Sequence, residues 1–106
     1  MDRYSRKDMI LEMLVTEPKD VFLNYALAIE LETEEKYEEA EKQFLKTLEV
    51  DEKYLPCFYR LGQIAEKIKT QEEAIAYYKK GLDLAKQQND NKTANELNEA
   101  IWLLED

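Results

Sequence analysis

The chain contains no histidine, one cysteine, two glycines and two prolines among its 106 residues. Without histidine, Ser-His-Asp and Cys-His catalysis are excluded, as is every zinc site that needs imidazole. The single cysteine, Cys57, excludes an intramolecular disulfide, so nothing indicates an oxidising compartment. All-β and α/β folds need many tight turns, and phosphate-binding loops need several glycines at motif spacing. Gly62 and Gly81 provide neither.

Basic residues are also scarce, because 15 lysines and arginines stand against 24 acidic residues, for a net charge of −9. A nucleic-acid-binding protein needs the opposite sign to displace counterions from phosphates, and anionic membrane surfaces are disfavoured for the same reason. No apolar run approaches the length of a membrane span, and the first residues do not lead into a secretory signal. We therefore expect a cytoplasmic protein that binds neither nucleic acid nor membrane.

What the sequence does contain is an internal repeat with a period of 34 residues. Residues 21–54 align with residues 55–88 at eight identical positions, where average composition gives roughly two or three by chance. The identical pairs are Tyr25/Tyr59, Leu27/Leu61, Glu32/Glu66, Glu38/Glu72, Glu39/Glu73, Ala40/Ala74, Lys46/Lys80 and Leu48/Leu82. Repeats of this length are typical of stacked helical hairpins that bury a shared core.

The apolar residues inside each repeat have helical spacing. Tyr37, Ala40 and Phe44 lie three or four positions apart, which makes one stripe on an α-helix and does not alternate as a strand would. The resulting helices are expected over residues 20–33, 37–50, 55–68 and 71–88, with flanking helices over residues 5–15 and 91–105. Thr70 is expected to cap the fourth of the repeat helices, and Asn89 to close it in a left-handed conformation.

Two half-units flank the repeats. Shifting the sequence by 34 places Ile10 over Phe44, so residues 5–18 correspond to the second half of an absent repeat. The helix over residues 91–105 is expected to cover the open end of the stack, as terminal elements of repeat proteins do. Together these patterns predict an all-α fold, with six antiparallel helices in a short right-handed solenoid.

The repeat resembles the tetratricopeptide repeat family, in which small residues occupy the eighth and twentieth positions. Those positions are Ala28 and Ala40 in the first full repeat, and Gly62 and Ala74 in the second. The resemblance implies one domain over residues 1–106. Its parts are a half repeat at 5–18, repeats at 21–54 and 55–88, and a C-terminal capping helix at 91–105.

The sequence departs from the family pattern at two kinds of position. The usual tryptophan at position four is replaced by Asn24 and Phe58, and the turn glycine at position fifteen by Glu35 and Lys69. If those turns keep a left-handed residue, each substitution destabilises by about 1 kcal/mol relative to glycine. Tyr25 and Ile29 stand where family members that grip carboxylate ends have lysine and asparagine, so that clamp is absent.

By resemblance, the first helix of each repeat lines a concave face that docks a partner peptide or helix. The predicted groove residues are Phe22, Tyr25, Ile29, Glu32, Tyr59, Gln63 and Glu66. Their acidic rim indicates a protein partner that is apolar with basic character. The alternative for Phe22, Tyr25 and Ile29 is that the helix over residues 5–15 simply buries part of the stripe that they form.

A second hypothesis is a structural or self-associating module. Trp102 and Leu103 lie off the apolar face of the last helix, so two chains could meet there as a homodimer with two-fold symmetry. In the competing interpretation Trp102 folds back over the neighbouring helix, and Leu103 is a single exposed leucine.

Catalysis finds no support in the sequence. Residues 30–42 hold seven glutamates against two lysines, a run typical of a solvated helix face rather than a cation site. No acidic residue lies in an apolar run that would raise its pKa for acid–base work. Cys57 has no histidine to activate it and is expected to be a small packed residue. We therefore predict that the protein is not an enzyme and binds no cofactor or metal.

Overall fold

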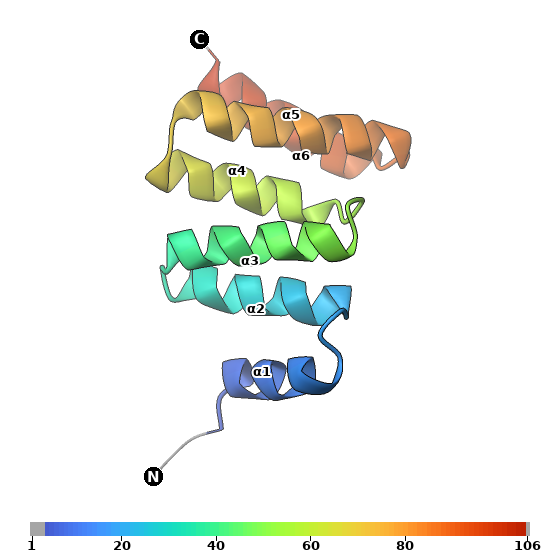
Figure 1. Ribbon diagram of the computed structural model, residues 1–106. Coiled ribbons are helices and arrows are strands. Elements are labelled where there is room, and N and C mark those ends of the chain that lie inside the picture. Colours follow the sequence, from blue (N-terminus) through green and yellow to red (C-terminus); the bar gives the residue numbers. More distant parts are fainter. Residues whose placement is uncertain (1–3, 106) are drawn as a thin grey trace. The chain divides into compact units, whose positions relative to one another are not determined.

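The computed structural model describes residues 4–105 and, within that range, consists of six α-helices without a strand (Figure 1). The helices are α1 (Arg6–Thr16), α2 (Val21–Thr33), α3 (Tyr37–Val50), α4 (Pro56–Ile68), α5 (Gln71–Gln87) and α6 (Asn91–Leu104). Each begins and ends within one residue of the boundary that the apolar spacing predicts. The predicted all-α helical repeat fold is confirmed. None of the helices in the described range is long and apolar enough to cross a membrane.

The chain divides into two compact units, with the boundary after Tyr54. Unit 1 contains α1 to α3 and unit 2 contains α4 to α6, so the boundary coincides with the border between the two 34-residue repeats. In each unit two consecutive helices pack as a hairpin, α2 with α3 and α4 with α5. A third helix packs beside each hairpin: α1 against α2 in unit 1, and α6 against α5 in unit 2.

The hairpin of unit 1 has alanine at both of its small-residue positions. Ala28 on α2 and Ala40 on α3 are fully buried, as is the ring of Phe44. Small side chains let two helix backbones approach, and the large ring fills the space beside them. This agrees with the register that the 34-residue alignment predicts for the interior.

A buried polar pair replaces apolar packing at the start of the same hairpin. Asn24 is 1% exposed, and its Nδ2 donates to the carbonyl oxygens of Pro18 at 3.0 Å and Asp20 at 2.9 Å. Nε2 of Gln43 donates in turn to Oδ1 of Asn24 at 2.9 Å. Both polar atoms of the buried Asn24 amide therefore have partners, which is the condition under which a polar side chain is tolerated inside a protein.

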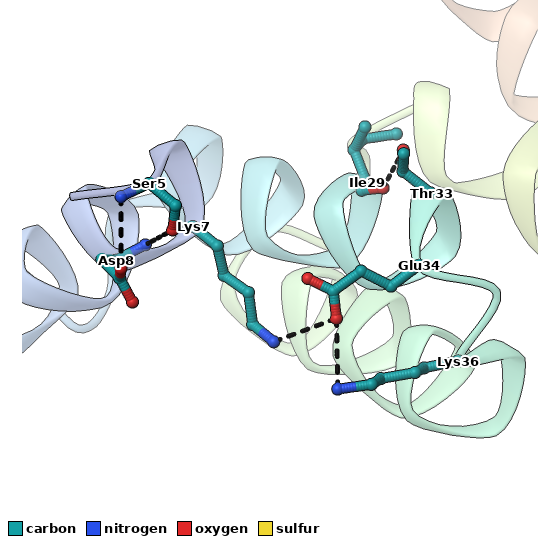
Figure 2. Close-up of polar contacts among 7 residues, drawn as sticks. All are labelled: Ser5, Lys7, Asp8, Ile29, Thr33, Glu34 and Lys36. Atoms are coloured by element: carbon teal, nitrogen blue, oxygen red, sulfur yellow. Dashed lines mark hydrogen bonds and ion pairs between the residues drawn. The ribbon is translucent and has the colours of Figure 1, made fainter. Parts of the chain in front are cut away.

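Charged side chains attach α1 to the end of α2 (Figure 2). Nζ of Lys7 and Nζ of Lys36 both contact Oε1 of Glu34, at 3.1 and 3.2 Å. The N-terminus of α1 is closed by a capping box, in which Ser5 and Asp8 exchange hydrogen bonds between side chain and backbone. This cap was not predicted, although the Ser-x-x-Asp spacing indicates it.

Unit 2 has one continuous apolar core. Its buried members are Leu55, Ala65, Ala74, Tyr78, Leu84, Ala85, Ala94, Leu97 and Ile101. The ring of Tyr78 lies directly over Gly62, because a Cβ placed on that glycine would come within 2.2–2.6 Å of three ring carbons. A Cβ on Gly81 would lie 2.7 Å from Cβ of Phe58, so this second glycine allows α4 and α5 to approach. Both glycines are required by sterics rather than by backbone conformation.

The turns inside the two hairpins differ. Glu35 has a φ of 61°, and Lys36 N–H donates to the Leu31 carbonyl at 3.0 Å, as in a Schellman motif. The equivalent Lys69 is extended, with a φ of −132°. There the hydroxyl of Thr70 accepts from Glu73 N–H at 3.1 Å and caps α5, as predicted. The first turn therefore keeps a left-handed residue at this position, and the second does not.

The connection from α5 to α6 follows the sequence prediction. Asn89 has a φ of 58°, and Asp90 N–H donates to the Ala85 carbonyl at 2.9 Å. The Asp90 carboxylate then accepts from Thr93 N–H at 3.0 Å and caps α6. Asparagine tolerates the left-handed region better than most residues, which explains its place at this helix end.

Candidate functional site

The predicted groove residues of unit 1 lie on α2 and differ in their surroundings. Phe22 is 60% exposed, whereas Tyr25, Ile29 and Glu32 are half-buried. The ring of Tyr25 packs 5.7 Å from that of Phe44, centroid to centroid, and makes an edge-on contact at 5.2 Å with Tyr54. Tyr25 therefore takes part in the aromatic packing of its own unit, while Phe22 is not covered by α1. Whether these residues line a partner groove stays a prediction.

The predicted groove residues of unit 2 come together at one recess of about 130 Å³. Its lining residues are Tyr59, Gln63 and Glu66 from α4, Tyr78 from α5, and Glu96, Glu99, Ala100, Leu103 and Leu104 from α6. The three α4 residues lie one helical turn apart, at i, i+4 and i+7, so the helix presents them along a single face. The α4 side of this recess consists of residues predicted from the sequence, whereas most of the α6 side was not predicted.

The recess has an aromatic floor and an acidic rim. The rings of Tyr59 and Tyr78 lie 5.8 Å apart, and the hydroxyl of Tyr78 donates to the carboxylate of Glu66. Burial raises the pKa of Tyr78, and the bond to Glu66 raises it further, so its hydroxyl stays the donor in this bond even above the ordinary tyrosine pKa of about 10. Within the described part of unit 2, the lining includes three glutamates and no lysine or arginine. Tyrosine faces and carboxylates together attract an ammonium or guanidinium group with an aliphatic stem.

Unit 1 contains a second recess, of about 250 Å³, which was not predicted from the sequence. It is lined by Leu11, Leu14, Val15 and Pro18 around α1, and by Asn24, Leu27, Gln43 and Lys46 from α2 and α3. The signal that could have found it is Asn24, because a small amide at the position of the usual tryptophan leaves space beside it.

Two large apolar residues protrude from α6. Trp102 is 74% exposed and Leu103 is 67% exposed. The interpretation that Trp102 folds back over the neighbouring helix is therefore wrong: the apolar face of α6 buries Ala94, Leu97 and Ile101, and position 102 lies off that face. Leu103 lines the rim of the unit 2 recess.

Cys57 is fully buried near the start of α4, which confirms that it is a packed residue. Among residues 4–105, no three histidine, cysteine, aspartate or glutamate side chains gather as a metal site would require. The acidic recess of unit 2 is the candidate site that brings the predicted residues Tyr59, Gln63 and Glu66 together.

Comparisons with known proteins agree with this architecture. The profile described as tetratricopeptide repeat matches residues 55–88. A tetratricopeptide repeat domain protein from Salinibacter ruber, solved in solution, is 31% identical with a TM-score of 0.77, over 83% of this chain and 89% of that one. A crystal structure of a Salinibacter ruber tetratricopeptide repeat domain protein is 29% identical with a TM-score of 0.74, over 80% of this chain and 94% of that one.

A protein from Bordetella parapertussis, also solved in solution, shares the fold at 19% identity, with a TM-score of 0.85 over 98% of this chain and 89% of that one. Among curated proteins, no match was found. The fold is that of a helical-repeat protein. More specifically, the chain belongs to the tetratricopeptide repeat family. Repeats of this family generally mediate protein–protein interaction and are generally non-catalytic.

Proposed function

We propose that the chain is a non-catalytic scaffold that binds a peptide or helix of a protein partner along the first helices of its repeats. The partner is apolar and carries at least one lysine or arginine. The observation that supports this most directly is the recess of unit 2, where Tyr59, Gln63 and Glu66 meet Glu96 and Glu99 across about 130 Å³. That volume suits one side chain and lies below the range of about 300–1,000 Å³ typical of small-molecule sites.

The electrostatics of the recess support a basic anchor residue. An aliphatic stem can lie along the ring of Tyr59, which is 36% exposed, while the charged head reaches the carboxylates. Because the whole chain carries a net charge of −9, the surrounding field also favours the approach of a basic segment. Rim charges of this kind mainly accelerate association and select partners by charge.

The proposal is tested by affinity capture from native lysate, followed by calorimetry with the segment of the captured protein that binds. The pair Glu96→Gln and Glu99→Gln removes two carboxylates from the recess rim. We expect binding of the basic segment to weaken several-fold and to become less sensitive to salt, since screened charge pairs carry the loss.

A matched control removes the same charge elsewhere. Glu38→Gln with Glu41→Gln changes two glutamates of α3 that do not line the recess. An equal loss of affinity in both double variants would show that only net charge matters, which contradicts a site at the recess. A partner segment without lysine or arginine would also contradict the proposed anchor.

Self-association is a second candidate function, favoured by the exposure of Trp102 and Leu103. Sedimentation at several protein concentrations tests it, and a monomer mass at every concentration would reject it. The two-fold contact between these residues, the cytoplasmic location and the assignment of residues 1–106 to a single domain stay predictions.

A further inference from the structure

The unit 1 recess has the size and lining of a receptor for one large apolar side chain. Its volume of about 250 Å³ equals roughly eight water molecules at ~30 Å³ each, which is the scale of a single aromatic ring system. Five of its lining residues are apolar: Leu11, Leu14, Val15, Pro18 and Leu27. Val15 is 81% exposed, so its apolar surface gains from being covered.

The polar residues at this recess suit an indole ring. Nε2 of Gln43 donates to the carbonyl and side-chain oxygens of Asn24, so the amide is oriented and its Oε1 remains as an acceptor. An indole offers a large apolar body and one N–H donor, which needs such an acceptor when buried. Lys46 lines the same recess, and no carboxylate does among the residues that the structure describes. The recess is thus apolar with a positive margin.

The chain itself presents a matching group. Trp102 is its only tryptophan, is 74% exposed, and is followed three positions later by Glu105, the C-cap residue just beyond the end of α6. Glu105 contacts Lys79 at 3.5 Å, but both side chains are at least half exposed, so this ion pair is weak and easily exchanged. An apolar ring followed by a carboxylate complements an apolar recess bordered by Lys46.

We propose that Trp102 of one copy of the chain enters the unit 1 recess of a second copy. The contact joins two different surfaces, α6 of one molecule and the recess beside α1 of the other. It therefore differs from a two-fold contact in which Trp102 meets its own counterpart. The inference is independent of the proposed peptide binding, because the acidic recess lies in unit 2 and this receptor lies in unit 1.

The test uses two complementary variants of the full chain. Trp102→Ala removes the inserted ring. Val15→Glu places a carboxylate at the recess, and because Val15 is exposed no buried residue is replaced. We expect sedimentation to show that the wild-type chain associates with rising concentration and that each variant alone associates at least about tenfold more weakly. Met9→Glu, on the same helix but outside the recess, is the matched control and should associate like the wild-type chain.

Mixing the two variants restores one intact contact, because the Val15→Glu chain supplies Trp102 and the Trp102→Ala chain supplies the recess. Since the Trp102→Ala chain has no tryptophan, the tryptophan emission in the mixture comes only from the other chain. We expect that emission to shift to shorter wavelength and to saturate at one to one.

Three results would overturn the inference: a wild-type monomer at all concentrations, wild-type association in Val15→Glu, or a mixture without a spectral shift. Association that is lost in Trp102→Ala but kept in Val15→Glu would identify the two-fold contact instead. An external partner that protects Val15 from solvent while the wild-type chain stays monomeric would identify another occupant of the recess.

Discussion

The two helical hairpins follow the same 34-residue register but fill it with different chemistry. At the fourth position, unit 1 buries Asn24 in a hydrogen-bonded pair, whereas unit 2 packs Phe58 against its apolar core. At the eighth position, Ala28 of unit 1 corresponds to Gly62 of unit 2, which lies under the ring of Tyr78. The repeat fold therefore determines at which positions small, large and turn residues occur. The interaction that stabilises each of these positions can differ between repeats.

The turns show the same freedom. Unit 1 keeps the left-handed residue after α2 and has no side-chain cap at Lys36, whereas unit 2 extends its backbone at Lys69 and caps α5 with Thr70. Each hairpin thus stabilises one side of its turn. The lesson is that a missing family residue is compensated locally, and at a different atom in each repeat.

The largest expected effects on the free energy of unfolding concern the fourth position of each repeat, which is Asn24 in unit 1 and Phe58 in unit 2. Phe58→Ala should lower the free energy of unfolding by about 3 kcal/mol, because it leaves a cavity beside the unit 2 core. Asn24→Ala should lower it by about 2 kcal/mol, because Gln43 and two backbone carbonyls lose their partners. Chemical denaturation measures both. A double-mutant cycle with Gln43→Ala should show coupling for Asn24, and additive losses would contradict the polar pair.

The next effect concerns the small-residue position of unit 2. Gly62→Ala should destabilise by about 1–2 kcal/mol, because overpacking against Tyr78 outweighs the gain in helix propensity. Adding Tyr78→Phe should recover part of this loss, since the ring is then no longer held by the bond to Glu66. Thermal unfolding of the single and double variants tests the prediction. Equal or higher stability of Gly62→Ala would show that the ring moves aside freely.

A smaller effect compares the two turns with one substitution. Glu35→Gly should stabilise by about 0.5–1 kcal/mol, because glycine adopts the left-handed conformation without steric strain. Lys69→Gly should instead destabilise by about a few tenths of a kcal/mol. The backbone of Lys69 is extended, so glycine relieves no strain there and only increases the conformational entropy of the unfolded chain. Denaturant midpoints of the two variants must therefore move in opposite directions. A shift of the same sign in both would contradict the difference between the turns.

The smallest effect lies at the end of α2, where Glu34 corresponds to Ile68 of α4. Lys7 and, to a lesser extent, Lys36 lower the pKa of Glu34 in the folded chain. The resulting stabilisation is present above the ordinary glutamate pKa of about 4.3 and is lost as pH falls through the lowered value. In Lys7→Gln, an NMR titration should show the Glu34 pKa rising toward its ordinary value. Arg6→Gln, which disrupts only the ion pair with Glu30, should leave it unchanged.

The fold could be predicted from the sequence because its determinants are periodic. The spacing of Ala40, Phe44 and their counterparts defined the helices, and Thr70, Asn89 and Asp90 defined helix ends through local hydrogen bonds. The departure of Lys69 from the left-handed region was not predictable, because it depends on how the last residue of α4 meets the cap of α5.

The candidate site was only partly predictable for a different reason. Tyr59, Gln63 and Glu66 share one face of one helix, so their proximity follows from helical geometry. Glu96 and Glu99 join them only through the packing of α6, which the 34-residue register does not determine because α6 begins 35 residues after α4. The unit 1 recess likewise arises from tertiary packing, since its lining comes from three helices and a connecting segment.

Because Cys57 is buried, the reactivity of its thiol can report local opening of the native state. A thiol reagent reaches this side chain only when the start of α4 becomes accessible, so the rate of alkylation under native conditions measures the free energy of that opening. No other thiol competes. Leu23, the counterpart of Cys57 in the first repeat, is 6% exposed. A chain with Leu23→Cys and Cys57→Ala would therefore report on α2 in the same way.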